Sequence, residues 1–278
     1  MRIIVCIKQV PDTREVRIDP VTNNLVRQGV PGMINPSDLT AFSAALKLRE
    51  MYGGSITLLS MGPAQAAEEL ERGLSMGADR AVLLCDRRFG GADTLATSYT
   101  LSEAVRKIGY DLVLCGNEAI DGCTGQVGPM IGEWLGIPAF TYVEKVEKRG
   151  EKLLVTRAGG RFRRVYSAEM PAVVCILNNE ETSEMPDNTP PDVPKTELWD
   201  ADGFDQEKIG LDGSRTRVSS ISVSGRKENY LQVEPFWDLE TRMDYIFSGG
   251  LTSKQTELTR GESAYLAETI VLDLKQMA

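Results

Sequence analysis

Over the first 175 residues, short apolar segments alternate with longer amphipathic ones, and this rhythm constrains the fold more than any other feature of the sequence. The short segments have the length and β-branched composition of strands; they are residues 3–7, 55–60, 80–85, 111–115 and 172–176. The longer segments carry apolar residues at helical spacing; they are residues 36–51, 63–76 and 93–108. Strands that alternate with helices form a mostly parallel sheet covered on both faces. The sequence therefore predicts a three-layer, doubly wound α/β domain.

After residue 142 the pattern changes. Segments 143–146, 152–156 and 161–165 alternate apolar and polar residues around glycine turns, which predicts a small antiparallel hairpin region. Residues 178–194 then collect four prolines among acidic and amide residues. Because proline cannot continue a sheet, this segment is expected to be a loop or linker.

Beyond the linker, apolar clusters are sparse until residues 261–277, which carry one apolar stripe. A helix of this length is marginal by itself, so we expect an amphipathic helix that packs against another subunit. The expected organisation is an α/β domain over residues 1–195 and a C-terminal arm over residues 196–278.

Composition argues against several classes of protein. The net charge of −9 disfavours a nucleic-acid partner. The chain contains no histidine, so imidazole-based catalysis and most metal sites are disfavoured. The five cysteines have no zinc-type spacing. No apolar run is long enough to cross a bilayer, and no secretory signal is visible, so we expect a cytoplasmic protein without membrane insertion.

Candidate binding residues follow from the strand order, because ligands of open α/β sheets lie at the carboxyl ends of the strands. Two loops there, residues 89–98 and 116–128, are rich in glycine, threonine and serine. Backbone amides at a helix start bind phosphate without a positive side chain. Neither loop is a P-loop or a Gly-x-Gly-x-x-Gly fingerprint. On spacing alone, glycines that merely end strands and cap helices explain these loops equally well.

Taken together, several segments are far more specific than either loop. In chain order these are Val5-Cys6-Ile7-Lys8-Gln9-Val10-Pro11-Asp12-Thr13, Asn35-Pro36-Ser37-Asp38, Met61-Gly62-Pro63, Gly77-Ala78-Asp79, Gly91-Ala92-Asp93-Thr94-Leu95-Ala96-Thr97-Ser98, Ala119-Ile120-Asp121-Gly122 and Gln126-Val127-Gly128-Pro129. This set resembles the beta subunit of electron-transfer flavoproteins over residues 1–176, and it is closest to the electron-bifurcating branch.

The resemblance implies a subunit that pairs with a larger alpha subunit carrying FAD and that itself holds FAD or, alternatively, AMP. The start of the third helix resembles the bifurcating branch, so FAD is favoured over AMP. The implied cofactor-binding residues are Cys6, Asn35, Pro36, Ser37, Asp38, Met61, Asp93, Thr94, Thr97, Ser98, Gly116, Asn117, Glu118, Ala119, Ile120, Asp121, Gly122, Cys123, Thr124, Gly125, Gln126 and Val127. No catalytic residue is implied, because the flavin performs the redox chemistry.

This sequence departs from the family pattern in three places. Asn117 and Glu118 stand where relatives usually have a basic residue and Gln, and Cys123 stands where many have Asp. Residues 179–186 are acidic, whereas the family's docking loop runs into a lysine-rich stretch. Charge reversal there can repel the usual dehydrogenase partner, so the redox partner's identity stays open. Arg215 and Arg217 resemble residues that approach the alpha subunit in the family, and exposed charges beside an edge strand are the alternative.

Two other classes of protein compete with an electron carrier. One is an adenine-nucleotide-binding regulatory module on the same scaffold, because fold alone never settles function. The other is a self-contained dehydrogenase, for which the sequence supplies no suitable proton donor.

Overall fold

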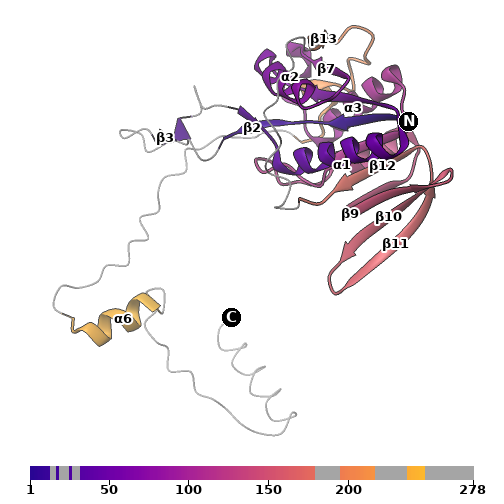
Figure 1. Ribbon diagram of the computed structural model, residues 1–278. Helices are drawn as coiled ribbons and strands as arrows, with labels where there is room; N and C mark the ends of the chain where they lie inside the picture. Colours follow the sequence, from indigo (N-terminus) through magenta and orange to yellow (C-terminus); the bar gives the residue numbers. More distant parts are fainter. Residues whose placement is uncertain (13–16, 19–24, 27–31, 179–194, 217–236, 248–278) are drawn as a thin grey trace, which may run out of the picture. The chain divides into compact units, whose positions relative to one another are not determined.

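A computed structural model describes residues 1–12, 17–18, 25–26, 32–178, 195–216 and 237–247 (Figure 1). The chain forms two compact units, which comprise Met1–Arg217 and Val218–Ala278. In the second unit the described element is helix α6 (Leu239–Phe247), where Trp237 and Tyr245 form an edge-to-face ring pair. The amphipathic helix expected at residues 261–277 and the acidic segment at residues 179–186 lie outside the described residues.

The first unit is built on one nine-stranded sheet with the strand order β11-β10-β9-β12-β8-β1-β6-β7-β13. Parallel pairing joins β1 (Arg2–Cys6), β6 (Ser55–Met61), β7 (Arg80–Leu84), β8 (Leu112–Gly116), β12 (Ala172–Ile176) and β13 (Glu197–Trp199), and it also joins β9 (Ala139–Arg149) to β12. The antiparallel strands are β10 (Lys152–Gly159) and β11 (Phe162–Glu169), which follow β9 as a ribbon at one edge (Figure 1). The hairpin region expected from the sequence is thus confirmed.

Helices cover both faces of the sheet. Helices α1 (Pro36–Tyr52) and α2 (Ala67–Ser75) bury Phe42, Leu48 and Leu70 against one face. Helices α3 (Thr94–Ile108) and α4 (Val127–Leu135) bury Val105 and Ile131 against the other. Alternate residues of each strand point to opposite faces, which explains why the strand segments are apolar throughout. The three-layer, mostly parallel α/β fold is confirmed.

Short elements complete the first unit. They are η2 (Ala64–Ala66), η3 (Arg87–Phe89), α5 (Gly210–Gly213) and two small antiparallel pairs, β2 (Gln9–Pro11) with β5 (Gly32–Ile34) and β3 (Arg17–Ile18) with β4 (Leu25–Val26). The segment expected to form one helix at residues 63–76 is divided between η2 and α2.

The chain continues to pack against this unit after residue 195, where the expected boundary lies. Strand β13 pairs with β7, and Glu197 accepts two hydrogen bonds of 2.7 Å from Arg80. Phe204 and Ile209 are buried in the core on the α3 side. The compact unit therefore reaches Arg217.

Candidate functional site

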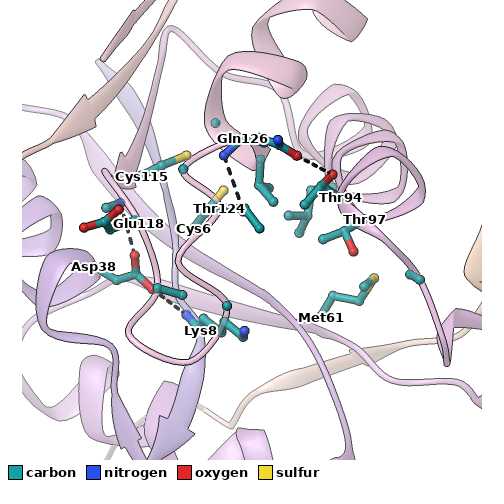
Figure 2. A pocket seen from close by; sticks show the side chains of 18 of the residues that line it. Cys6, Lys8, Asp38, Met61, Thr94, Thr97, Cys115, Glu118, Thr124 and Gln126 are labelled. Atoms are coloured by element: carbon teal, nitrogen blue, oxygen red, sulfur yellow. Dashed lines mark hydrogen bonds between the residues drawn. The ribbon is translucent and has the colours of Figure 1, made fainter. Parts of the chain in front are cut away.

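A cavity of about 670 Å³ lies at the carboxyl ends of β1, β6 and β8 (Figure 2). Its volume falls within the range of roughly 300–1,000 Å³ typical of small-molecule sites. The predicted residues that line it are Cys6, Asp38, Met61, Asp93, Thr94, Thr97, Gly116, Asn117, Glu118, Ala119, Gly122, Thr124, Gly125, Gln126 and Val127. The two predicted loops and the tip of β1 therefore meet at one site.

Other predicted residues lie outside the cavity lining; they are Asn35, Pro36, Ser37, Ser98, Ile120, Asp121 and Cys123. Ser98 is fully buried, where its hydroxyl donates to the Leu95 carbonyl and accepts from the Trp134 indole. Its bond to Trp134 places it in the packing between α3 and α4, since it follows the lining residue Thr97 directly and so lies about 100° further around the helix.

The loop of residues 117–126, called here the binding loop, is held from the start of α1. The buried Asn35 side chain donates to the Glu118 carbonyl at 3.0 Å and accepts from the Ile120 amide at 3.1 Å. At the tip of β1, the Lys8 Nζ lies 2.7 Å from both carboxylate oxygens of Asp121. Asn35 and Asp121 thus shape the binding loop rather than line the cavity.

Asp38 joins the tips of the two central strands. Its carboxylate accepts from the backbone amide of Lys8 at 2.8 Å and from that of Gly116 at 3.1 Å (Figure 2). Burial raises the pKa of Asp38 to about 7, although these amides, Asn35 and the Lys8 charge pull in the opposite direction. A Cβ at Gly116 would lie 2.3 Å from the Asp38 carboxylate, so glycine permits this approach.

Asn117 and Glu118, the unusual pair in the binding loop, have different environments. Asn117 is buried, and its side-chain oxygen accepts from the amide of Tyr142, which has a positive φ of 56°. Asn117 therefore fixes the start of β9 instead of offering that oxygen to a ligand. Glu118 is exposed and lines the cavity, where it disfavours an anion.

Helix α4 points its positive end at the cavity. Gln126 precedes its first turn without a side-chain capping hydrogen bond, and Val127 and Gly128 line the cavity. Free amides and the helix dipole at such a start favour a phosphate. A Cβ on Gly128 would lie 2.3 Å from the Cys175 sulfur, so glycine allows α4 to begin directly against the sheet.

Helix α3 begins beside α4 at the cavity, and its N-terminus is already capped. Asp93 accepts from the amides of Leu95 and Ala96 at 3.0 Å each, and from those of Arg215 and Thr216 at 2.7 and 2.9 Å. Burial opposes ionisation, but these four donors together hold the pKa of Asp93 below its usual value. The Asp93 carboxylate is thus committed to the backbone.

The starts of α3 and α4 are linked directly at the cavity. The Thr94 hydroxyl donates to the Gln126 side-chain oxygen at 2.9 Å (Figure 2). Thr97, one turn later on α3, also lines the cavity. These side chains bring α3 and α4 together at the site.

Sequence reasoning missed several lining residues; they are Ile7, Lys8, Leu59, Phe89, Gly91, Ala92, Leu101, Cys115, Gly128 and Thr216. Phe89, Gly91, Ala92 and Gly128 belong to the two loops selected from the sequence, although they were not singled out within them. The rule that ligands lie at strand ends identifies Lys8, which follows β1, and Cys115, which lies at the end of β8. Thr216 carries no such signal, since only its contact with Asp93 brings residues 215–216 near the cavity.

Most of the charged side chains that line the site are acidic. Lys8 is the one basic side chain among the described lining residues, which also include the acids Asp38, Asp93 and Glu118. Over the described residues, there is no cluster of three or more acidic or cysteine side chains placed to hold a metal ion. The arrangement suits a ligand bound by amide donors on one side and by apolar and sulfur-containing side chains on the other.

Comparison with known proteins identifies the class. Residues 22–198 match the family model described as the electron transfer flavoprotein domain. The chain is 48% identical over 228 residues to an electron transfer flavoprotein subunit beta of Clostridium acetobutylicum, covering 80% of this chain and 88% of the relative. It is also 42% identical over 234 residues to a subunit beta of Megasphaera elsdenii, covering 80% and 87%.

A third relative is Protein FixA of Azorhizobium caulinodans, which is 44% identical over 251 residues, covering 84% of this chain and 89% of the relative. The fold, the family match and these identities define an electron transfer flavoprotein domain. The chain belongs to the beta-subunit family of electron-transfer flavoproteins. In the described part of the chain, no helix combines the length and apolar character needed to cross a membrane.

Proposed function

We propose that this chain is the beta subunit of a heterodimeric electron-transfer flavoprotein and that it holds FAD in the cavity at the strand ends. With an alpha subunit it carries electrons between a dehydrogenase and an acceptor. The observation that carries the proposal is the cavity of about 670 Å³, where the binding loop, α3 and α4 meet. The names of the related proteins support the electron-transfer role.

The lining residues fit a flavin nucleotide. The uncapped start of α4 and the binding-loop amides suit the phosphates. Phe89, Leu101 and Met61 offer apolar surface for a ring system. Lys8 and the α4 dipole offset the unfavourable charge of Glu118. A bound flavin supplies the redox chemistry, whereas the protein positions it and controls its polar surroundings.

AMP is the second candidate ligand, because a monophosphate needs only the α4 start and the binding loop. FAD is favoured because the cavity also reaches Met61, Thr94 and Thr97 on the α3 side. FAD in this subunit, together with FAD in the alpha subunit, corresponds to an electron-bifurcating carrier. All five cysteines are free thiols, which suits the reducing cytoplasm that we propose as its compartment.

Co-expression with the alpha subunit, followed by a count of cofactors per heterodimer, tests this function. Two FAD per heterodimer support the bifurcating carrier, and one FAD with one AMP supports simple electron carriage. A colourless chain that binds an adenine nucleotide without a flavoprotein partner would instead indicate the regulatory module. Turnover of a nicotinamide cofactor by this chain alone would indicate a self-contained dehydrogenase.

A further inference from the structure

The ion pair between Lys8 and Asp121 joins the tip of β1 to the middle of the binding loop. We propose that this pair is a latch that holds the binding loop over the bound nucleotide and slows the nucleotide's release. The inference rests on the proposed function, because it concerns retention of the nucleotide in the same cavity. Lys8 and Asp121 are positioning residues in this account, and neither takes part in redox chemistry.

The geometry of the pair suits a latch. The Lys8 Nζ lies 2.7 Å from each Asp121 oxygen, so the ammonium bridges the whole carboxylate. The base of the Lys8 side chain is fixed, because the Lys8 backbone amide donates to the buried Asp38 at 2.8 Å. Asp121 belongs to the binding loop and lies outside the cavity lining. Its pairing with the anchored Lys8 therefore ties the binding loop to the tip of β1.

Asp121 lies between the parts of the binding loop that other side chains hold. Asn35 holds residues 118 and 120 from one side, and Thr94 holds Gln126 from the other. Between these contacts lie Gly122, where nothing in the described part of the chain beyond its neighbours lies within 4 Å of the position that a Cβ would occupy, and Gly125, with a φ of +60°. Glycine has a wider range of backbone conformations than other residues, and the backbone hydrogen bond described for this stretch runs from the Cys123 amide to the Ala119 carbonyl at 2.8 Å. The Lys8–Asp121 pair acts on that stretch, which supplies the lining residues Gly122, Thr124 and Gly125.

The exposure of the pair makes its strength adjustable. The Lys8 and Asp121 side chains are 50% and 37% exposed, so salt in the solvent weakens their attraction. Asn35, in contrast, is fully buried and holds the loop through uncharged hydrogen bonds. We therefore expect ionic strength to change nucleotide release through the latch while the rest of the loop stays in place.

Direct binding of a phosphate by Lys8 is a simpler role, and it leads to a different expected result. As the one basic side chain in the described lining, Lys8 can attract a phosphate directly. In that case Asp121 competes with the phosphate for Lys8, and removing Asp121 tightens binding. If the pair is a latch, removal of either partner accelerates release to a similar extent.

The test uses the full chain purified with its alpha subunit, loaded with AMP or FAD, and measures the dissociation rate by displacement. Lys8→Gln and Asp121→Asn should each accelerate release about twofold to fivefold at low salt, as expected for an exposed ion pair. The double variant Lys8→Glu/Asp121→Lys should restore most of the slow release. At about 1 M salt, where the screening length falls to about 3 Å, the difference from wild type should shrink.

A matched control is Arg80→Gln, which removes a comparably exposed 2.7 Å ion pair with Glu197 away from the cavity. It should leave the release rate unchanged at every salt concentration. Hydrogen exchange supplies a second readout: amides of the binding loop should exchange faster in Asp121→Asn, whereas those of β12 should not.

The outcomes separate the latch from the proposed function. Release that is unchanged in both single variants, or slower in Asp121→Asn alone, overturns the latch while leaving a nucleotide-binding subunit in place. Faster release in Lys8→Gln alone also overturns it, because Lys8 then acts directly on the phosphate. A wild-type complex that retains neither AMP nor FAD in this chain overturns both proposals.

Discussion

Asp38 is a buried carboxylic acid, so its contribution to the stability of the fold depends on pH. Its folded-state pKa of about 7 lies above the ordinary aspartate value of 3.8 because burial disfavours the charge. A group with a raised folded pKa contributes stability that is fully present below its unfolded pKa and is lost as pH rises through its folded pKa. The loss from Asp38 therefore falls between about pH 4 and pH 7.

Asp38→Asn should remove this dependence. At pH 5 the variant should be less stable than wild type. The two oxygens of Asp38 each accept from one backbone amide, those of Lys8 and Gly116, whereas Asn has a single side-chain oxygen that can accept. The deficit should narrow toward pH 8, since each pH unit between the unfolded and folded pKa values corresponds to about 1.4 kcal/mol at most. Urea unfolding of the variant and of wild type at pH 5 and pH 8 measures this difference in stability.

Asp111→Asn is the control for this titration. The hydrogen bond from Arg2 is the main cause that lowers the pKa of Asp111, so the group is ionised throughout this pH range. Its variant should differ from wild type by the same amount at pH 5 and pH 8. A constant difference for Asp38→Asn as well would show that Asp38 does not titrate in this range.

Gln126 is the second residue with a specific consequence. Gln126→Ala removes the acceptor of the Thr94 hydroxyl and a lining side chain. We expect nucleotide affinity to fall about threefold to tenfold, which corresponds to one hydrogen bond. Thr94→Val should have a similar effect, and the double variant should cost less than the sum. Gln65→Ala, an exposed residue outside the lining, should leave affinity unchanged.

At the scale of elements, the approach of α4 to the sheet depends on Gly128. Gly128→Ala would place a Cβ 2.3 Å from the Cys175 sulfur, and such overpacking costs about 1–3 kcal/mol. Because the α4 start then shifts, we expect both lower stability and weaker nucleotide binding. Thermal unfolding and a binding titration measure the two effects.

Two further variants test this explanation. Cys175→Ala in the Gly128→Ala background removes the clashing sulfur and should recover part of the stability. Gly122→Ala is the matched control for stability, because nothing among the described residues beyond its neighbours lies within 4 Å of the position that its new methyl group would occupy. Equal losses for Gly122→Ala and Gly128→Ala would contradict a role for the contact between α4 and the sheet.

The elements show what the sequence could and could not predict. The apolar rhythm predicted the central strands and α1 and α3 because their buried faces dictate residue type at every position. Strand β13 carried no such signal, since it is a three-residue edge strand whose Leu198 is exposed. The sequence suggested ligand contacts for all the Thr and Ser residues at the start of α3. In the structure the direction of each side chain around the helix decides, and Ser98 points into the core.

At the scale of the whole molecule, the extent of the α/β unit is testable by truncation. A chain that ends at residue 217 should keep the thermal stability of that unit. A chain that ends at residue 195 loses β13, buried Phe204 and Ile209, and the Asp93 contacts with residues 215–216. It should unfold at a clearly lower temperature. Equal melting temperatures would place the boundary at residue 195 after all.

The central claim is that the amide-rich strand ends of this chain hold an adenine nucleotide. The most direct measurement is a crystal structure of the full chain purified together with its alpha subunit. We expect a nucleotide phosphate within hydrogen-bonding distance of the Val127 or Gly128 amide, with the ring system extending toward Met61 and Thr97. A cavity filled by protein side chains, or a nucleotide bound elsewhere on this chain, would contradict it.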